Sequence, residues 1–131
     1  MIRGSCLCGS VRYEIRGPLV HVTHCHCSQC RKAHGAAFGT YGTVNRADFK
    51  FVSGESDVAA YASSAGVLRT FCKRCGATLQ FIRESRPQTF SLALGTLDDD
   101  PGVRPSHHIF VGSKAPWFEL ADALPRHDRR P

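Results

Sequence analysis

The sequence FCKRCGATL (Phe71–Leu79) places two cysteines on a tight turn between two apolar, β-prone segments. Both thiolates of a C-x-x-C motif can bind one metal ion through such a turn. A following glycine helps, because glycine adopts a left-handed backbone conformation without strain. Here Gly76 directly follows Cys75. The stretch therefore predicts a zinc knuckle that joins two antiparallel strands.

A C-x-C motif near the N-terminus offers the two ligands that the knuckle lacks. In the sequence CLCG, Cys6 and Cys8 stand two residues apart, and side chains i and i+2 of an extended chain point to the same face. Sulfur ligands about 2.3 Å from a tetrahedral zinc ion lie roughly 3.8 Å apart, which such a pair can reach with slight bending. Cys6, Cys8, Cys72 and Cys75 are therefore predicted to form a closed, structural zinc site. That site would fix an early strand against a late one.

The remaining cysteines form a second cluster in the stretch THCHCSQCRKAHG (Thr23–Gly35). Cys25, Cys27 and Cys30 place three thiolates within six residues. Three ligands leave the fourth position of a tetrahedral ion open to water or substrate, as catalytic zinc sites do. Sulfur ligation favours zinc, and an open position on it suits a further sulfur ligand.

Two other groupings of these ligands are open. A histidine could complete a closed Cys3His site, and His24 and His34 are near enough in sequence to do so. His26 is a weaker candidate, because its place between two ligands directs it to the opposite face. Alternatively, Cys6 and Cys8 could join this cluster and leave the knuckle short of ligands.

The cysteine count and the composition favour metal binding inside a cell. The chain has 131 residues, of which 42% are apolar and seven are cysteines, an odd number that excludes complete disulfide pairing. The first residues, MIRGSCLCGSVRYEI, lack the apolar core of a signal peptide, and no apolar run approaches the ~20 residues that cross a bilayer. We therefore expect a cytoplasmic protein whose cysteines bind metal rather than one another.

The net charge predicts neither a nucleic-acid nor a membrane partner. The formal value is +6, and it falls once seven thiols bind two zinc ions as thiolates. Part of the remainder lies in the final RHDRRP (Arg126–Pro131), which has three arginines and one aspartate. The rest of the chain is too mildly basic to indicate nucleic-acid binding. We expect a single zinc-binding β domain over residues 1–124, followed by a disordered basic tail over residues 125–131.

Short alternating apolar segments predict a mainly β fold with antiparallel sheets. Gly, Pro, Asn, Asp and Ser clusters separate these segments, as turns require. The helix signals are weak and limited to a turn or two after Cys30 and another at NRADF (Asn45–Phe49). The predicted strands are Val11–Ile15, Gly35–Val44, Phe49–Val52, Val67–Cys72, Ala77–Ile82 and Thr89–Leu94.

These motifs resemble the glutathione-dependent formaldehyde-activating enzymes, a family that also includes centromere protein V. The resemblance runs from about Gly4 to Trp117 and places all seven cysteines on the family's positions. It rests on four stretches: GSCLCGSVRYEI (Gly4–Ile15), HCHCSQCRKAHG (His24–Gly35), RTFCKRCGATL (Arg69–Leu79) and HHIFVGSKAPW (His107–Trp117).

The resemblance implies an Mss4-like fold, in which antiparallel β-sheets form a tent-like cavity around zinc. It assigns the four-cysteine set to a structural zinc and the Cys25, Cys27 and Cys30 set to a catalytic zinc. The implied activity is the carbon–sulfur lyase reaction that interconverts S-(hydroxymethyl)glutathione with glutathione and formaldehyde. Glutathione would be the substrate or co-substrate, and the protein a monomer or homodimer.

Glutathione carries two carboxylates and one ammonium, so its pocket should offer cationic donors. Arg31 and Lys32 directly follow the cysteine cluster, and Lys114 lies in the GSKAPW stretch, so these three are the predicted substrate-binding residues. Trp117 and Phe118 are expected in the core. The candidates for the base that removes the hydroxymethyl proton are four histidines, His24, His34, His107 and His108.

Two functions without catalysis are the alternatives. A zinc-binding protein-interaction module would need an exposed apolar patch large enough for a partner. A thiol redox sensor or zinc store would oxidise or empty the open site while the other zinc keeps the fold.

Overall fold

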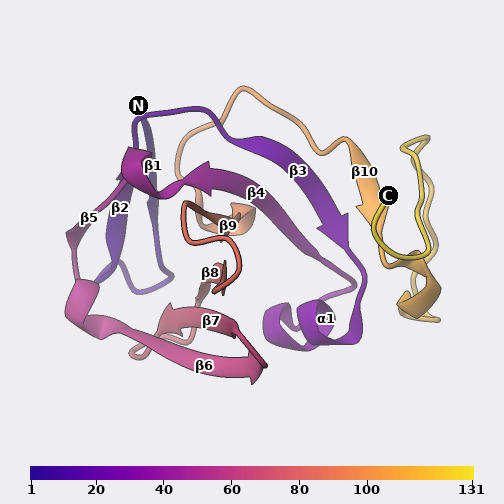
Figure 1. Cartoon of the computed structure of the whole chain (residues 1–131), viewed down its shortest axis with the longest axis horizontal. Helices are drawn as coiled ribbons and strands as arrows, with labels where there is room; N and C mark the ends of the chain where they lie inside the picture. Colours follow the sequence, from indigo (N-terminus) through magenta and orange to yellow (C-terminus); the bar gives the residue numbers. More distant parts are fainter.

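The computed structural model describes residues 1–131. Its ten strands form two sheets, and it has one short α-helix (Figure 1). The smaller sheet is antiparallel, in the order β1-β2-β5. Its strands are β1 (Ile2–Ser5), β2 (Arg12–Ile15) and β5 (Phe49–Ser53). The predicted mainly β fold is confirmed.

The larger sheet has seven strands in the order β10-β3-β4-β9-β8-β7-β6. All its neighbours pair antiparallel except β10 and β3, which run parallel and depart from the predicted antiparallel pattern. Along the chain the strands are β3 (Val20–Cys25), β4 (Gly39–Asn45), β6 (Val58–Ser64), β7 (Val67–Cys72), β8 (Thr78–Arg83), β9 (Thr89–Ala93) and β10 (His107–Ile109).

Four of the ten strands carry no clear apolar alternation and were not predicted: β1, β3, β6 and β10. The single α-helix, α1 (Ser28–His34), covers the turn expected after Cys30, and a 3-10 turn at Arg46–Asp48 covers the one expected at NRADF. No helix here combines the length and the apolar character that crossing a bilayer requires.

The main core lies where the two sheets face each other. Its fully buried side chains come from both sheets and from the segment that links them, and burial of this apolar area is the main stabilising term. The Tyr13 hydroxyl reaches Thr96 Oγ1 at 2.6 Å, so this buried polar group is satisfied. The cluster consists of Tyr13, Ile15, Leu19, Val44, Phe90 and Leu92.

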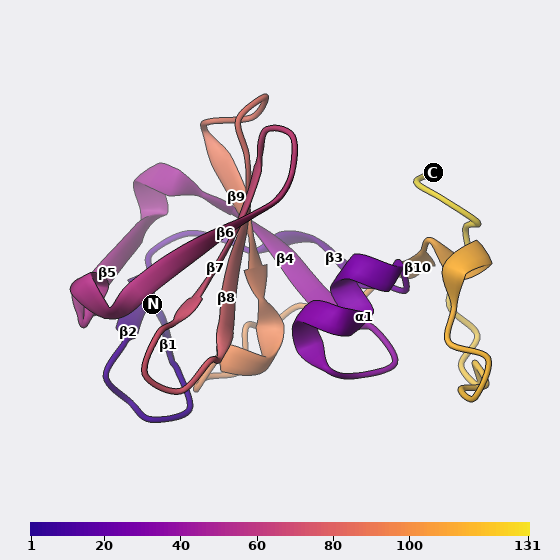
Figure 2. The same ribbon diagram turned by 90° about the horizontal axis from the view of Figure 1, so that it is seen from below.

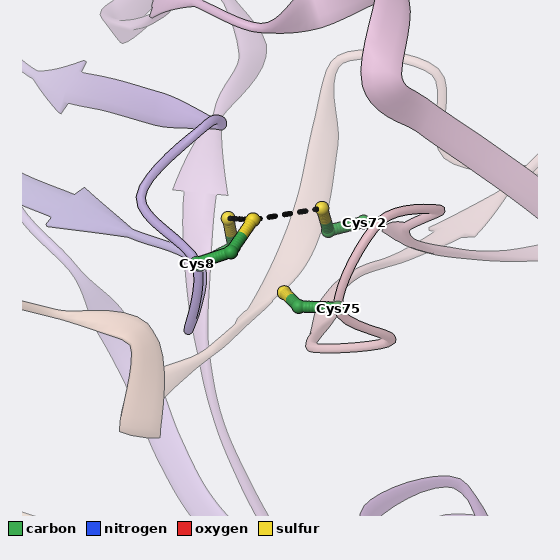
Figure 3. Close-up of side chains that lie close together, drawn as sticks. Cys8, Cys72 and Cys75 are labelled. Atoms are coloured by element: carbon green, nitrogen blue, oxygen red, sulfur yellow. Dashed lines mark hydrogen bonds between the residues drawn. The ribbon is translucent and has the colours of Figure 1, made fainter.

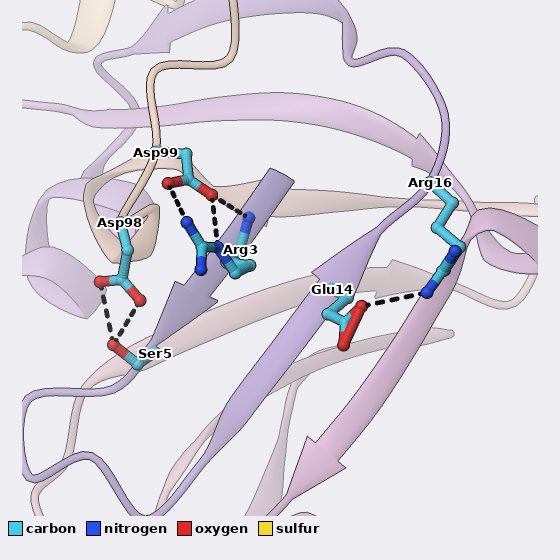
Figure 4. A network of polar contacts seen from close by, with 6 residues as sticks. All are labelled: Arg3, Ser5, Glu14, Arg16, Asp98 and Asp99. Atoms are coloured by element: carbon cyan, nitrogen blue, oxygen red, sulfur yellow. Dashed lines mark hydrogen bonds and ion pairs between the residues drawn. The ribbon is translucent and has the colours of Figure 1, made fainter. Parts of the chain in front are cut away.

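A polar network ties β1 to the loop that follows β9 (Figure 4). The Arg3 backbone N–H donates to Asp99 Oδ2 at 2.8 Å, and its guanidinium bonds the same carboxylate at 3.1 and 3.2 Å. Ser5 Oγ donates to Asp98 at 2.9 Å. These exposed contacts each contribute little to stability. They fix the direction in which the chain leaves β1, directly before Cys6.

The C-terminal residues pair with β10. The His108 N–H donates to the Pro125 carbonyl at 2.9 Å, and the His127 N–H returns a bond to the His108 carbonyl at 3.0 Å. The Phe110 N–H donates to the Arg129 carbonyl at 3.2 Å. Backbone groups of the outer strand make these contacts. Both views place this segment on the β10 side of the molecule (Figures 1 and 2).

Candidate metal centres and active site

Four cysteines from two distant parts of the chain meet between the two sheets. Cys6 and Cys8 lie on the loop after β1, Cys72 ends β7, and Cys75 lies on the turn before β8. All four Sγ atoms are within 4.8 Å of one another. Figure 3 shows Cys8 facing Cys72 and Cys75 across the gap between their loops. The distances from Cys8 Sγ to Cys6 Sγ and Cys72 Sγ are 3.6 and 3.9 Å, close to the spacing of tetrahedral zinc ligands.

Both loops of this cluster use glycine as the knuckle geometry requires. Gly76 has φ +79°, and its N–H donates to the Cys72 carbonyl at 2.7 Å. Gly9 has φ +80°, and its N–H donates to the Cys6 carbonyl at 3.2 Å. The first loop is thus a second knuckle, a feature that the C-x-C spacing alone did not indicate.

The surroundings of Cys6 favour its thiolate form. Burial works to raise the pKa of Cys6, but the Val11 N–H, at 3.3 Å from the sulfur, and neighbouring polar groups outweigh it and lower the pKa to about 6. A thiolate is the form that binds metal. The four sulfurs therefore fit a closed zinc site in number, spacing and chemistry.

The second cluster joins the end of β3 to the start of α1. Cys25 ends β3, Cys27 is the N-cap of α1, and Cys30 lies buried in the first turn. Their three Sγ atoms lie within 4.8 Å of one another. The Cys30 N–H donates to Cys27 Sγ at 3.3 Å, so the sulfur that caps the helix also belongs to the cluster. Hydrogen bonds from Cys25 and Cys30 lower the pKa of Cys27.

No histidine ligand atom belongs to this three-cysteine group. His24 Nδ1 is bonded to Thr40 Oγ1 at 2.8 Å, and His34 Nε2 is bonded to the Tyr41 hydroxyl at 2.8 Å. His26 is also outside the group, and its Nε2 is bonded to His108 rather than to a cysteine. The geometry gives no support to the closed Cys3His alternative, and Cys6 and Cys8 join the knuckle rather than this cluster.

His26 belongs to a row of polar groups that the sequence did not reveal, in which two buried histidines lead to the exposed Asp122. His26 Nε2 lies 2.8 Å from His108 Nδ1, and His108 Nε2 lies 2.9 Å from Asp122 Oδ2. The carboxylate accepts from His108 Nε2, so Nδ1 of His108 accepts from His26. Burial and the neighbouring His108 lower the pKa of His26 to about 4. This row connects the loop after β3 to β10 and to the C-terminal segment.

Arg69 of β7 reaches the three-cysteine cluster from across the sheet. Its Nη1 and Nη2 atoms lie 3.9 and 3.8 Å from Cys30 Sγ, and Nη1 also donates to the Tyr41 hydroxyl at 3.2 Å. The guanidinium stacks over Phe81 at 4.8 Å, and only 7% of Arg69 is exposed. A buried cation beside the sulfurs offsets the negative charge that thiolates bring.

Two cavities adjoin the cluster, and Cys25 and Cys30 line both of them. One has a volume of about 340 Å³ and extends along β3, β4 and β8. The other has a volume of about 690 Å³ and includes Cys27 and Arg69 in its wall. Both volumes suit a small-molecule ligand. Each of the three cysteines therefore lines at least one cavity in which a ligand could reach the cluster.

Comparison with known proteins identifies the family. A family model described as glutathione-dependent formaldehyde-activating enzyme matches residues 1–113, which include all seven cysteines. The chain belongs to this family. Both cysteine clusters lie within the part of the chain that the family model matches.

The chain is also similar to individual curated proteins and to a solved structure. The chain is 33% identical over 78 residues to an uncharacterized lyase of Schizosaccharomyces pombe, covering 60% of this chain and 55% of that protein. It is 30% identical over 89 residues to a provisionally named glutathione-dependent formaldehyde-activating enzyme of Colletotrichum graminicola, covering 68% of this chain and 46% of that protein. These matches span about half of each curated relative. A crystal structure of a Rhodobacter sphaeroides protein aligns with TM-score 0.62 and 26% identity, over 79% of this chain and 91% of that one.

In this member of the formaldehyde-activating family, the predicted substrate-binding residues are not among those that line the two cavities. Arg31, Lys32 and Lys114 line neither of them. The Lys114 ammonium donates instead to the backbone carbonyls of Ala115 and Phe118. Trp117, expected in the core, is 69% exposed. The cations that do line the cavities are Arg69, Arg83, Arg86, Arg129 and Arg130.

Substitution of Arg69 tests whether the cation beside Cys30 supports metal binding at the three-cysteine cluster. We expect Arg69→Gln to weaken zinc binding at the three-cysteine cluster by about 10- to 100-fold, the usual cost of losing such a partner. Zinc competition with a chromogenic chelator measures both sites, and the four-cysteine site should be unchanged. Arg16→Gln makes the same substitution on the surface and should leave both affinities unchanged. Equal zinc affinity in the wild type and Arg69→Gln would show that Arg69 does not support the site.

Proposed function

We propose that this protein is a zinc-dependent carbon–sulfur lyase acting on S-(hydroxymethyl)glutathione or a related thiol–formaldehyde adduct. The proposal is carried by one observation: the Cys25, Cys27 and Cys30 thiols gather beside two cavities with no fourth protein ligand. Family membership supports glutathione and formaldehyde as the reactants. A relative that is named a lyase supports the same reaction class.

The two cysteine sets fit two zinc ions. The four-cysteine set would hold a structural ion, because its four ligands close the coordination shell. The three-cysteine set would hold a catalytic ion. Bound there, zinc would supply Lewis acidity that stabilises a thiolate sulfur. The seven cysteines are all free thiols, so we also propose a reducing cytoplasm as the setting.

The reaction requires that a residue of the chain accept and return one proton, that of the hydroxymethyl group. In the cleavage direction the carbon–sulfur bond breaks, and the sulfur leaves as a thiolate with the bonding electrons. The carbon–oxygen double bond of formaldehyde forms as the hydroxyl proton leaves. In the opposite direction the thiolate attacks formaldehyde and the same proton returns to the oxygen. A side chain that holds this proton must face the cavity beside the cysteines.

His107 is the best placed of the four predicted bases. It lines the 340 Å³ cavity with Cys25 and Cys30, whereas His24, His34 and His108 do not. Its Nδ1 is bonded to Ser106 Oγ at 2.8 Å, which leaves Nε2 to accept a proton. Burial and the neighbouring His127 lower the pKa of His107, so the ring is neutral at pH 7 and can act as a base.

The direct test is the exchange between glutathione, formaldehyde and their adduct at equilibrium. These reactants combine without a catalyst, so exchange NMR must compare zinc-loaded protein with a protein-free sample. We expect the loaded protein to accelerate exchange about 100-fold or more, a usual contribution from a positioned base. An unchanged exchange rate in a sample that holds two zinc ions per chain would overturn the assignment.

A further inference from the structure

The 340 Å³ cavity beside the cysteines has a strongly cationic wall. Three arginines line it, Arg83 at the end of β8, Arg86 in the following turn and Arg130 from the C-terminal segment. His21 and His107 also line it, and none of the 14 lining residues is acidic. Thr23, Thr43 and Ser91 add hydroxyl groups to the same wall. The cavity wall therefore offers hydrogen-bond donors and three guanidinium groups, and none of its side chains is a carboxylate.

The protein leaves these three arginines without an ionic partner. Arg83, Arg86 and Arg130 form no ion pair, although four other arginines of the chain do. Burial, and then the charges of Arg130 and Arg86, lower the pKa of Arg83, which reflects repulsion among the three. Gathering like charges disfavours the folded protein, and a bound anion removes that penalty. This arrangement is typical of a site that binds an anionic ligand.

The arginines and the cysteines lie on one cavity, so one ligand can reach both. Cys25 and Cys30 line the same space as the three guanidiniums. A third cavity, of about 200 Å³, shares Arg83 and Arg86 with the 340 Å³ cavity, and no cysteine lines it. A ligand with a sulfur group and carboxylates several bonds away matches this layout. Paired N–H groups make arginine well suited to bind carboxylates.

Arg130 lies in a part of the chain that the family model does not match. The match ends at residue 113, whereas Arg130 follows the segment that pairs with β10. The Arg129 carbonyl accepts from the Phe110 N–H, and the Arg130 guanidinium lies 5.6 Å from the centre of the Phe110 ring. The pairing with β10 thus carries Arg130 to the cavity.

We propose that Arg83, Arg86 and Arg130 bind the carboxylates of the thiol substrate and make the site selective for dicarboxylate thiols. This inference rests on the proposed lyase function and assigns the residues that recognise its thiol substrate. Arg130 then acts as a specificity residue contributed by the C-terminal segment. Neutral thiols reach the cysteines without gaining these contacts, so they bind more weakly.

Calorimetric titration of the zinc-loaded protein tests the proposal without any turnover. The probes are glutathione and its glycyl monoethyl ester, both added without formaldehyde. Each of Arg83→Gln, Arg86→Gln and Arg130→Gln should weaken glutathione binding about tenfold or more, since hydrogen bonds to charged groups have that effect. Arg12→Gln removes an exposed arginine on β2 and should leave binding unchanged. Circular dichroism verifies that every variant folds.

The monoethyl ester shows whether the arginines recognise carboxylates. The wild type should bind the ester more weakly than glutathione, and at least one arginine variant should lose part of that difference. Equal glutathione affinity in all variants, equal affinity of the wild type for both probes, or no binding by the wild type would each overturn the proposal. The exchange experiment separates the two hypotheses. Lyase activity without arginine-dependent binding overturns only the carboxylate site, and arginine-dependent binding without lyase activity overturns only the reaction.

Discussion

Cys27→Ala protein should exchange formaldehyde between glutathione and its adduct no faster than a protein-free sample. This is the expected result because Cys27 is both a predicted ligand of the catalytic ion and the N-cap of α1. Two thiolates cannot hold zinc as tightly as three, so the whole acceleration, about 100-fold or more, should disappear. Metal analysis should show one zinc ion per chain in place of two.

The fold of Cys27→Ala should survive, which separates lost chemistry from lost structure. Removing a cap bond costs about 1 kcal/mol, well below the stability of an ordinary domain. Thermal unfolding followed by circular dichroism should therefore remain cooperative. Full catalytic acceleration in Cys27→Ala, with its single zinc ion verified, would exclude the three-cysteine cluster as the active site.

Cys72→Ala is expected to have the opposite effect, with loss of the folded state itself. Cys72 is fully buried at the end of β7, and its sulfur approaches Cys8 from the other knuckle. Structural zinc contributes about 10–16 kcal/mol at neutral pH in zinc-finger peptides, comparable to the total stability of a domain. The variant should show no cooperative thermal transition, and a strong chelator should unfold the wild type in the same way.

Leu7→Ala is the matched control for this cluster. Leu7 lies between Cys6 and Cys8 but is 85% exposed, so truncating it should leave the melting temperature and the zinc content unchanged. If Cys72→Ala melts at the wild-type temperature, the four-cysteine set does not hold the fold together. Measured side by side, Cys27→Ala and Cys72→Ala assign one cluster to chemistry and the other to stability.

The grouping of the cysteines could be predicted from sequence because it depends on local geometry. A C-x-C pair shares a face and a C-x-x-C pair closes on a turn, so each pair can bind one ion. Matching Cys6 and Cys8 with Cys72 and Cys75 was favoured over the alternative because it completes the knuckle and uses every cysteine. Strands with alternating apolar residues, such as β2 and β7, were predicted for the same reason. Metal binding at both clusters stays a prediction.

The surroundings of the active site could not be predicted, because they depend on which strands become neighbours. Arg69 is an ordinary polar residue of β7 in the sequence, and only the sheet order brings it to Cys30. Arg31 and Lys32 are adjacent to the cysteines along the chain and belong to α1, but neither of them lines the cavities. Strand β3 was missed because VHVTHC contains two histidines and a threonine where an apolar alternation would be expected.

The pairing of residues 125–129 with β10 also decides how the large sheet meets other molecules. A free outer strand exposes N–H and C=O groups that can recruit a strand from another chain and start aggregation. On the β10 side, backbone bonds to the C-terminal segment occupy these groups. The opposite edge, β6, has no such cover, and its Tyr61 is 65% exposed. The two margins of the sheet are therefore unequal, and any self-association through strand addition would begin at β6.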